Sequence, residues 1–141
     1  MTRYLLDTNV LSELRRRHPD RKVIAFFEAQ ALEDLFIADA TLAEIRFGAL
    51  VAWDAALRAV IEEWLDRVVR PLFAGRVLGA GEDVWLRWCV LNAEGRRAGY
   101  TYPQPDLVLA AIAAQHGLTV ATRDTEPFLR AGVPVLNPWT A

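Results

Sequence analysis

The chain has 141 residues, 53% of them hydrophobic and 24% charged, which excludes a disordered protein and allows one buried core. Its formal net charge of −2 excludes a protein that holds nucleic acid by overall positive charge alone. Lys22 is the only lysine and Cys89 the only cysteine, so an internal disulfide, a cysteine metal cluster and a catalytic lysine elsewhere in the chain are excluded too. The apolar neighbours of Cys89 predict a core position for its side chain.

The N-terminal part of the chain predicts two strands and two helices. The apolar segment Arg3–Leu6 is typical of a strand, and it stops at Asp7-Thr8-Asn9, three residues that favour helix caps. Helices are expected over Val10–Arg17 and from about Asp20 to Ala31. Leu35–Ala38 predicts the second short strand.

The middle of the chain is mostly helical in its pattern. Helices are expected over Thr41–Trp53, over Ala55–Val69 and, carrying two tryptophans, over Glu82–Gly99. Between the last two, a glycine-containing segment around Arg76–Leu78 predicts a short strand.

The C-terminal part supplies the clearest strand, Leu118–Thr122, after a helix over Asp106–His116. Val133–Leu136 predicts a last strand. Strands that alternate with helices favour an α/β fold with a parallel sheet covered on both faces. No internal repeat, low-complexity stretch or linker is visible, so we expect a single domain over residues 1–141.

Two acidic residues stand where this sheet would bind a ligand. Asp7 follows the first predicted strand, and Asp124 follows the strand Leu118–Thr122. In open parallel sheets, ligands bind at the carboxyl ends of the strands, near a switch in strand order. We therefore expect these two carboxylates to meet at one edge.

Four acids are candidates for chemistry, and each also has a purely structural interpretation. Asp7 can cap the helix that follows it. Thr41 and Glu44 have the spacing of a capping box, and Asp106 lies in a first helical turn, where the helix dipole favours an acid. Asp124 can cap a short helix. These interpretations stay open for each residue taken alone.

Taken together, the four acids predict a metal site. Carboxylates packed closely must be neutralised by protons or by a cation. Oxygen ligands alone suit Mg²⁺ or Mn²⁺, and zinc is disfavoured because His18 and His116 are not at ligand spacing. Such an ion can carry a phosphate oxygen and lower the pKa of a bound water, which is the chemistry of phosphodiester hydrolysis. The sequence has no G-x-S-x-G elbow, P-loop or G-x-G-x-x-G.

Several segments resemble PIN-domain ribonuclease toxins of the VapC type, and in particular the FitB-like subgroup. The likeness spans almost the whole chain and rests on four acids in the same order and context. The segments are LLDTNVLSE (Leu5–Glu13), TLAEIRFGA (Thr41–Ala49), PLFAGR (Pro71–Arg76), PDLVLAAIAAQHGLTVATRD (Pro105–Asp124) and NPW (Asn137–Trp139).

The resemblance implies a PIN-like α/β/α sandwich with a central parallel sheet of four to five short strands. It implies the toxin of a type II toxin–antitoxin system, a Mg²⁺- or Mn²⁺-dependent endoribonuclease. The expected partners are RNA, a second copy of the chain and a cognate antitoxin, a small DNA-binding protein that can build a larger assembly. An antitoxin arginine that enters the acidic pocket and displaces metal is a further implied possibility.

The resemblance also assigns roles to individual residues. One departure is Pro103-Gln104-Pro105 before the third acid, where small residues are commoner, and it could change how this loop meets RNA. The implied catalytic and metal-binding acids are Asp7, Glu44, Asp106 and Asp124, with Asn9 and Thr122 as polar residues that support them.

Arginines beside the acids are candidates for RNA contacts. Arg46 and Arg123 adjoin Glu44 and Asp124 in sequence, and Arg15-Arg16-Arg17 follow the first acid at a helix end. Solvated helix ends and ion pairs are the alternative for each. The five tryptophans favour core, dimer or antitoxin contacts over base stacking.

Other functional classes remain open at this point. A catalytically weak PIN-fold partner would act mainly through its complex with the DNA-binding antitoxin, and a small-molecule phosphohydrolase would ignore RNA. The sequence does not name the RNA that is cleaved. No signal peptide and no apolar run of the roughly 20 residues that span a bilayer is visible, so we expect a cytoplasmic protein without a membrane segment.

Overall fold

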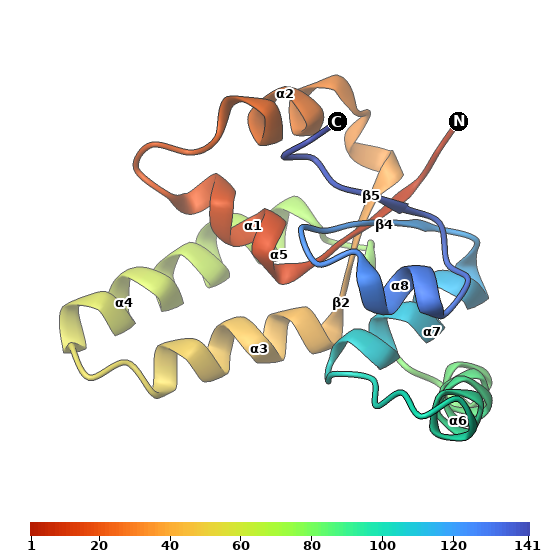
Figure 1. Cartoon of the computed structure of the whole chain (residues 1–141). Helices are drawn as coiled ribbons and strands as arrows, with labels where there is room; N and C mark the ends of the chain where they lie inside the picture. Colours follow the sequence, from red (N-terminus) through yellow and green to blue (C-terminus); the bar gives the residue numbers. More distant parts are fainter.

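Five short apolar segments form one parallel sheet in the order β3-β2-β1-β4-β5. The computed structural model describes all residues, Met1–Ala141. Helices cover both faces of the sheet (Figure 1), so the predicted α/β/α sandwich is confirmed. The strands are β1 (Tyr4–Leu6), β2 (Leu35–Ala38), β3 (Val77–Leu78), β4 (Thr119–Ala121) and β5 (Val135–Leu136).

Most predicted helices are present with bounds that shift by a few residues. The helix expected to begin at Thr41 begins at Asp39, and the helix expected over Ala55–Val69 is α4 continued by a π-helical stretch, η2. The helices are α1 (Thr8–Arg15), α2 (Arg21–Ala29), η1 (Leu32–Asp34), α3 (Asp39–Leu50), α4 (Ala55–Trp64), η2 (Leu65–Val69), α5 (Arg70–Leu72), α6 (Glu82–Arg97), α7 (Asp106–His116) and α8 (Glu126–Arg130).

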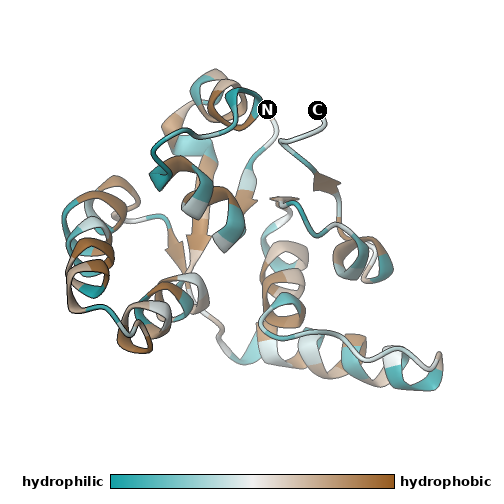
Figure 2. Ribbon diagram, turned by 60° about the vertical axis from the view of Figure 1, so that its left-hand side comes forward, coloured by the Kyte–Doolittle hydropathy of each residue, from teal (hydrophilic) through white to brown (hydrophobic).

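The sheet divides the interior into two hydrophobic cores. Successive strand residues point to opposite faces, so Leu5 joins one core and Leu6 the other. The first core packs against α7, whose residues from Leu107 to Ala113 are all buried, and the second packs against α1, η2 and α5. Figure 2 shows strands coloured as apolar in the middle of the molecule, with helices of mixed apolar and polar composition around them.

The order of the strands creates a switch point between β1 and β4. From β1 the chain proceeds to β2 and β3 on one side, whereas β4 and β5 lie on the other. The connections therefore diverge above the carboxyl ends of β1 and β4, which is where such sheets bind ligands. The backbone N–H of Asp7 donates to the carbonyl of Ala121 at 3.0 Å, which fixes the two strand ends side by side.

The structure shows that two side chains expected or allowed in the core, Cys89 and Trp53, are exposed. The core position predicted for Cys89 is wrong, because α6 presents its thiol to solvent. Trp53, in the turn between α3 and α4, is 94% exposed, so this tryptophan is not part of the core. None of the helices has both the length and the apolar character needed to cross a membrane.

The segment before β3 is anchored by the guanidinium of Arg76. It donates hydrogen bonds to the backbone carbonyls of Leu32, Leu35 and Leu72, and it lies over the ring of Phe73 at 5.3 Å. These contacts tie η1, the start of β2 and α5 together at one edge of the sheet.

We predict that Arg76→Ala lowers the free energy of unfolding by about 2 kcal/mol, because it leaves carbonyl groups without their charged donor. Urea denaturation measures the change. Arg58→Ala is the control, since Arg58 pairs only with Glu62 along the exposed side of α4 and an exposed pair contributes roughly 0.5 kcal/mol. Equal losses for both variants would contradict the anchoring role.

Candidate active site

Asp7 stands at the centre of the candidate site. It follows β1 and is only 6% exposed. One carboxylate oxygen accepts the backbone N–H of Thr8 at 2.7 Å, and the other accepts the hydroxyl of Thr122 at 2.8 Å. Asp7 is therefore the N-cap of α1, as its structural interpretation expects, and it also faces the switch point.

Thr122 organises the polar groups around Asp7. Its buried hydroxyl donates to Asp7, accepts the backbone N–H of Asp124 at 3.0 Å, and accepts the side-chain amide of Asn9 at 3.3 Å. The oxygen of Asn9 receives the backbone N–H of Arg123 at 3.4 Å. With its proton and both lone pairs engaged, the hydroxyl can present only a donor to Asp7.

Glu44 reaches the site from the middle of α3. Its carboxylate accepts a hydrogen bond from the hydroxyl of Thr8, and the capping box with Thr41 is not formed because α3 begins at Asp39. Thr41 is fully buried and its hydroxyl has no partner. From the sequence, Thr8 is expected only to favour a helix cap. Nothing in the residues around it indicates a hydrogen bond to Glu44, which lies 36 residues further along the chain.

Asp106 and Asp124 approach from the other side of β1. Asp106 is the first residue of α7, after the cis peptide bond between Gln104 and Pro105. Asp124 follows β4 and is exposed. It does not cap α8, whose N-cap is Thr125 and makes no side-chain hydrogen bond, so that structural interpretation of Asp124 is wrong.

The four carboxylates repel one another. Burial raises the pKa of the Asp106 carboxyl to about 6, and the charges of Asp7, Asp124 and Glu44 add to the rise. Burial likewise raises the pKa of Asp7, against the hydrogen bonds from Thr122 and Thr8, with smaller contributions from Glu44 and Asp124. Acids from four separate segments thus share one electrostatic environment at the end of β1.

This donor set suits a hard divalent cation. Every candidate ligand is a carboxylate oxygen, and no histidine or cysteine accompanies them. The side chains do not form a closed set of three ligands at coordination distance. A cation bound among the four carboxylates would relieve their mutual repulsion.

Two hollows adjoin the acids. On one side, Asp106 and Asp124 line a cavity of about 500 Å³ together with Tyr100, Glu126 and neighbouring residues. Burial raises the pKa of the Tyr100 phenol further above its ordinary value of 10.0. On the other side, Glu44 lines a smaller hollow of about 150 Å³ between α1, α3 and α4.

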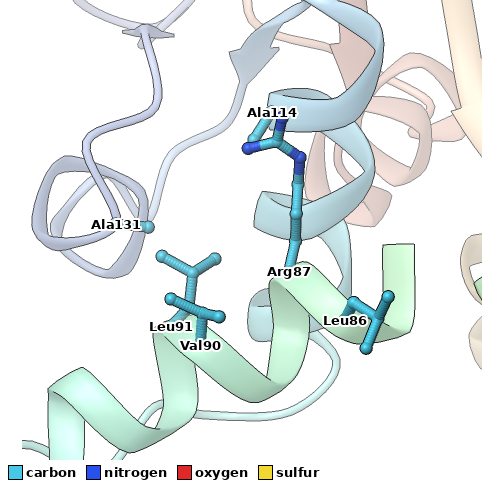
Figure 3. A pocket seen from close by; sticks show the side chains of 6 residues that line it. All are labelled: Leu86, Arg87, Val90, Leu91, Ala114 and Ala131. Carbon is cyan, nitrogen blue, oxygen red and sulfur yellow. The ribbon is translucent and has the colours of Figure 1, made fainter. Parts of the chain in front are cut away.

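A third hollow is unrelated to the acids. It measures about 290 Å³ and lies between α6, α7 and the turn after α8, where Leu86, Val90 and Leu91 supply an apolar lining (Figure 3). Arg87 crosses its edge and donates to the side chain of Gln115 at 2.7 Å. Because no carboxylate lines it, this hollow lacks the groups that metal-assisted hydrolysis needs.

The two arginines predicted to contact RNA have protein partners. Arg46 forms an ion pair with Asp66 at 2.8 Å, and this contact lowers the pKa of Asp66. The guanidinium of Arg123 lies 4.7 Å from the centre of the Trp139 ring. A role of either residue in binding RNA stays a prediction.

The fold and the acidic switch point are those of a PIN domain. The sequence matches the family described as PIN domain over residues 4–134, and the chain belongs to that family. VapC ribonuclease Y4jK of Sinorhizobium fredii is 41% identical over 135 residues, 96% of this chain and 96% of the relative. The toxin FitB of Neisseria gonorrhoeae is 40% identical over 135 residues, 96% of this chain and 97% of the relative.

Solved structures agree with this assignment. The crystal structure of FitAcB from Neisseria gonorrhoeae has a TM-score of 0.91 at 39% identity, covering 98% of this chain and 99% of that chain. FitAB bound to an IR36 DNA fragment has a TM-score of 0.88 at 38% identity, covering 96% and 95%. VapBC-5 from Mycobacterium tuberculosis, of the VapBC family of toxin-antitoxin systems, has a TM-score of 0.69 at 26% identity, covering 96% and 97%. The resemblance to VapC-type PIN-domain toxins is confirmed.

The repulsion predicts how stability depends on pH when no metal is present. Folded Asp106 keeps its proton up to about pH 6, whereas the ordinary value is 3.8, so the folded state binds more protons between these values. Its contribution to stability therefore falls as the pH rises through this window. We predict that Asp106→Asn, which cannot ionise, melts at a higher temperature than the unsubstituted protein near pH 7.

Thermal melts in a chelator check this prediction. The difference in Tm between Asp106→Asn and the unsubstituted protein should shrink as the pH falls toward about 4, where the folded carboxyl is protonated and the unfolded one begins to bind protons as well. Glu28→Gln, on the exposed side of α2, changes the charge equally and should show no such dependence. A difference in Tm that stays constant over this range would refute a repulsive cluster.

Proposed function

We propose that this chain is the ribonuclease toxin of a type II toxin–antitoxin system and that it hydrolyses RNA with Mg²⁺ or Mn²⁺ held at the acidic cluster. The observation that carries the proposal is the convergence of four mutually repelling carboxylates on the switch point of the sheet. Relatives named VapC ribonuclease and toxin FitB, similar over nearly their whole length, support the same activity.

The residues of the site would have two roles, metal binding and the positioning of the metal-binding side chains. Asp7, Glu44, Asp106 and Asp124 would hold the cation. When bound, the cation supplies positive charge for a phosphate oxygen and lowers the pKa of a water. The hydrogen bond from Thr122 fixes the orientation of the Asp7 carboxylate, and Thr8 does the same for Glu44. Apart from the carboxylates, no candidate general base is present in the site.

The proposed partners follow from the relatives and from the surface. The solved neighbours include a complex bound to a DNA fragment and a toxin–antitoxin complex, which supports an antitoxin that binds DNA. Large apolar side chains are exposed at the end of α3 and in the turn after it, including Phe47 at 65% and Val51 at 62%. Such a patch supports the homodimer, because exposed apolar clusters mark protein interfaces. A toxin that cleaves cellular RNA would act in the cytoplasm, and that location is part of the proposal.

Asp7→Asn should abolish metal-dependent cleavage without unfolding the chain. Asparagine can still cap α1 through its single side-chain oxygen, but its amide group cannot accept from Thr122, and the substitution removes a charged ligand. We predict at least a roughly 100-fold loss of the rate at which Mn²⁺-loaded protein cuts a single-stranded RNA, given that even supporting residues of metal sites change activity by about 10- to 100-fold. Circular dichroism checks the fold, and Glu28→Gln is the matched control.

The outcome also separates the functional classes. A protein that leaves RNA intact with both Mg²⁺ and Mn²⁺ would instead be the catalytically weak partner of an antitoxin. A protein that hydrolyses small phosphate esters but not RNA would be a phosphohydrolase.

Cation binding should be visible without any substrate. Because the ion relieves repulsion only in the folded state, Mn²⁺ should raise the Tm near pH 7, with about 2.7 kcal/mol of added stability at 100 times its Kd. The rise in Tm should be smaller near pH 5, since protons on Asp106 compete with the metal. Asp106→Asn should lose most of the effect in the same melts. An equal rise in Tm for this variant would place the metal elsewhere.

A further inference from the structure

The hollow beside Glu44 contains a positive charge without a carboxylate partner. Its lining includes Ser12 and Arg15 from α1, Gly48 from α3 and Trp64 from the end of α4. No carboxylate lies within ion-pair distance of Arg15, whereas the neighbouring Arg16 pairs with Glu13. The guanidinium is therefore free to bind an anion.

Trp64 determines how this guanidinium is held. The carbon at the centre of the Arg15 guanidinium lies 5.7 Å from the centre of the indole ring. Stacking on an aromatic face steadies the planar group while leaving its edge of N–H donors open. That edge matches two oxygens of a phosphate, and Ser12 adds a hydroxyl in the same hollow.

The two hollows beside the acids differ in charge. The larger one is lined by Asp106, Asp124 and Glu126 and by no basic residue, so it repels a phosphate that no cation neutralises. The smaller one sets Arg15 against a single acid, Glu44. Its volume of about 150 Å³ is below the roughly 300 Å³ at which ligand pockets begin, which suits one backbone group rather than a whole nucleotide.

We propose that this hollow binds the RNA phosphate next to the one that is cleaved, with Arg15 as the residue that contacts it. The inference rests on the proposed ribonuclease function and deepens it, because it names the side of the acidic cluster along which the RNA backbone continues. Arg15 then offsets the repulsion that the phosphate experiences from Glu44 and positions the scissile bond over the acids.

Charge removal tests the contact. The substrate is a short unstructured RNA whose cleavage position has been mapped with the unsubstituted protein and Mn²⁺. Arg15→Ala should raise KM roughly tenfold and change kcat by less than about twofold, and Arg15→Lys should restore part of the loss. Arg21→Ala removes the same charge from an exposed residue of α2 that does not line the hollow, and it should leave KM unchanged.

A second test alters the RNA at the phosphate that Arg15 is proposed to contact. Replacing single phosphates near the cleavage position with neutral methylphosphonates should identify one neighbouring phosphate whose charge matters to the unsubstituted protein. The same replacement should have little further effect on Arg15→Ala, because the partner of that phosphate is already gone. Independent, additive losses would overturn the contact.

A steric block tests the hollow without touching any charge. A Cβ added at Gly48 would meet no atom within 4 Å, and glycine inside a helix is less favourable than alanine or leucine. Gly48→Ala should keep nearly full activity, whereas Gly48→Leu should fill the hollow and raise KM while the Tm does not fall. Loss of cleavage in a variant at least as stable as the parent cannot come from unfolding.

The results separate this inference from the function on which it rests. If the unsubstituted protein does not cut RNA with either metal, the ribonuclease proposal fails. If it cuts RNA but Arg15→Ala and Gly48→Leu behave like Arg21→Ala, only the phosphate site fails. Variants that cut RNA normally but bind the antitoxin less tightly would assign the hollow to the antitoxin and overturn the inference.

Discussion

The structure of the site depends on one electrostatic constraint, the placement of four carboxylates within range of one another. Burial and mutual repulsion raise the pKa of Asp106 to about 6, so the folded protein without a cation carries an unfavourable charge cluster near neutral pH. The fold tolerates it because the surrounding hydrogen bonds favour the charged form of Asp7, through Thr8 and Thr122. Because the carboxylates repel one another when no cation is bound, a divalent cation bound among them would stabilise the folded protein strongly.

The backbone, more than the side chains, brings these acids together. Asp7 and Asp124 come after adjacent parallel strands whose connections diverge, and the hydrogen bond from Asp7 to Ala121 holds the strand ends in register. Glu44 and Asp106 arrive on helices from opposite sides of that point. Because both cores bury alternate residues of the same strands, a shift in strand register would displace the acids and the cores at once.

The sequence predicted the features that depend on local patterns and missed those that depend on tertiary packing. Strand and helix patterns are local, and so the five strands and the longer helices were predictable, with ends uncertain by a few residues. The meeting of Asp7 and Asp124 was predictable because parallel topology places strand ends on one edge, whereas Glu44 and Asp106 were assigned from the resemblance to the family. The contact of Thr8 with Glu44 and the exposure of Cys89 were not, since each depends on which face of a helix the tertiary packing leaves open. The predicted capping box failed for the same reason, because the start of α3 is set by its packing after β2.

Because the net charge is not positive, individual arginines rather than a broad basic surface would have to attract the RNA phosphates. With 16 basic and 18 acidic residues, the chain has no excess of positive charge to attract RNA from a distance. Most arginines near the site are already engaged, Arg46 by Asp66 and Arg16 by Glu13. Attraction for a phosphate must then come from a cation among the carboxylates and from a guanidinium that has no carboxylate partner. Arg15 meets that condition next to Glu44, so binding and catalysis would be coupled through neighbouring charges of opposite sign.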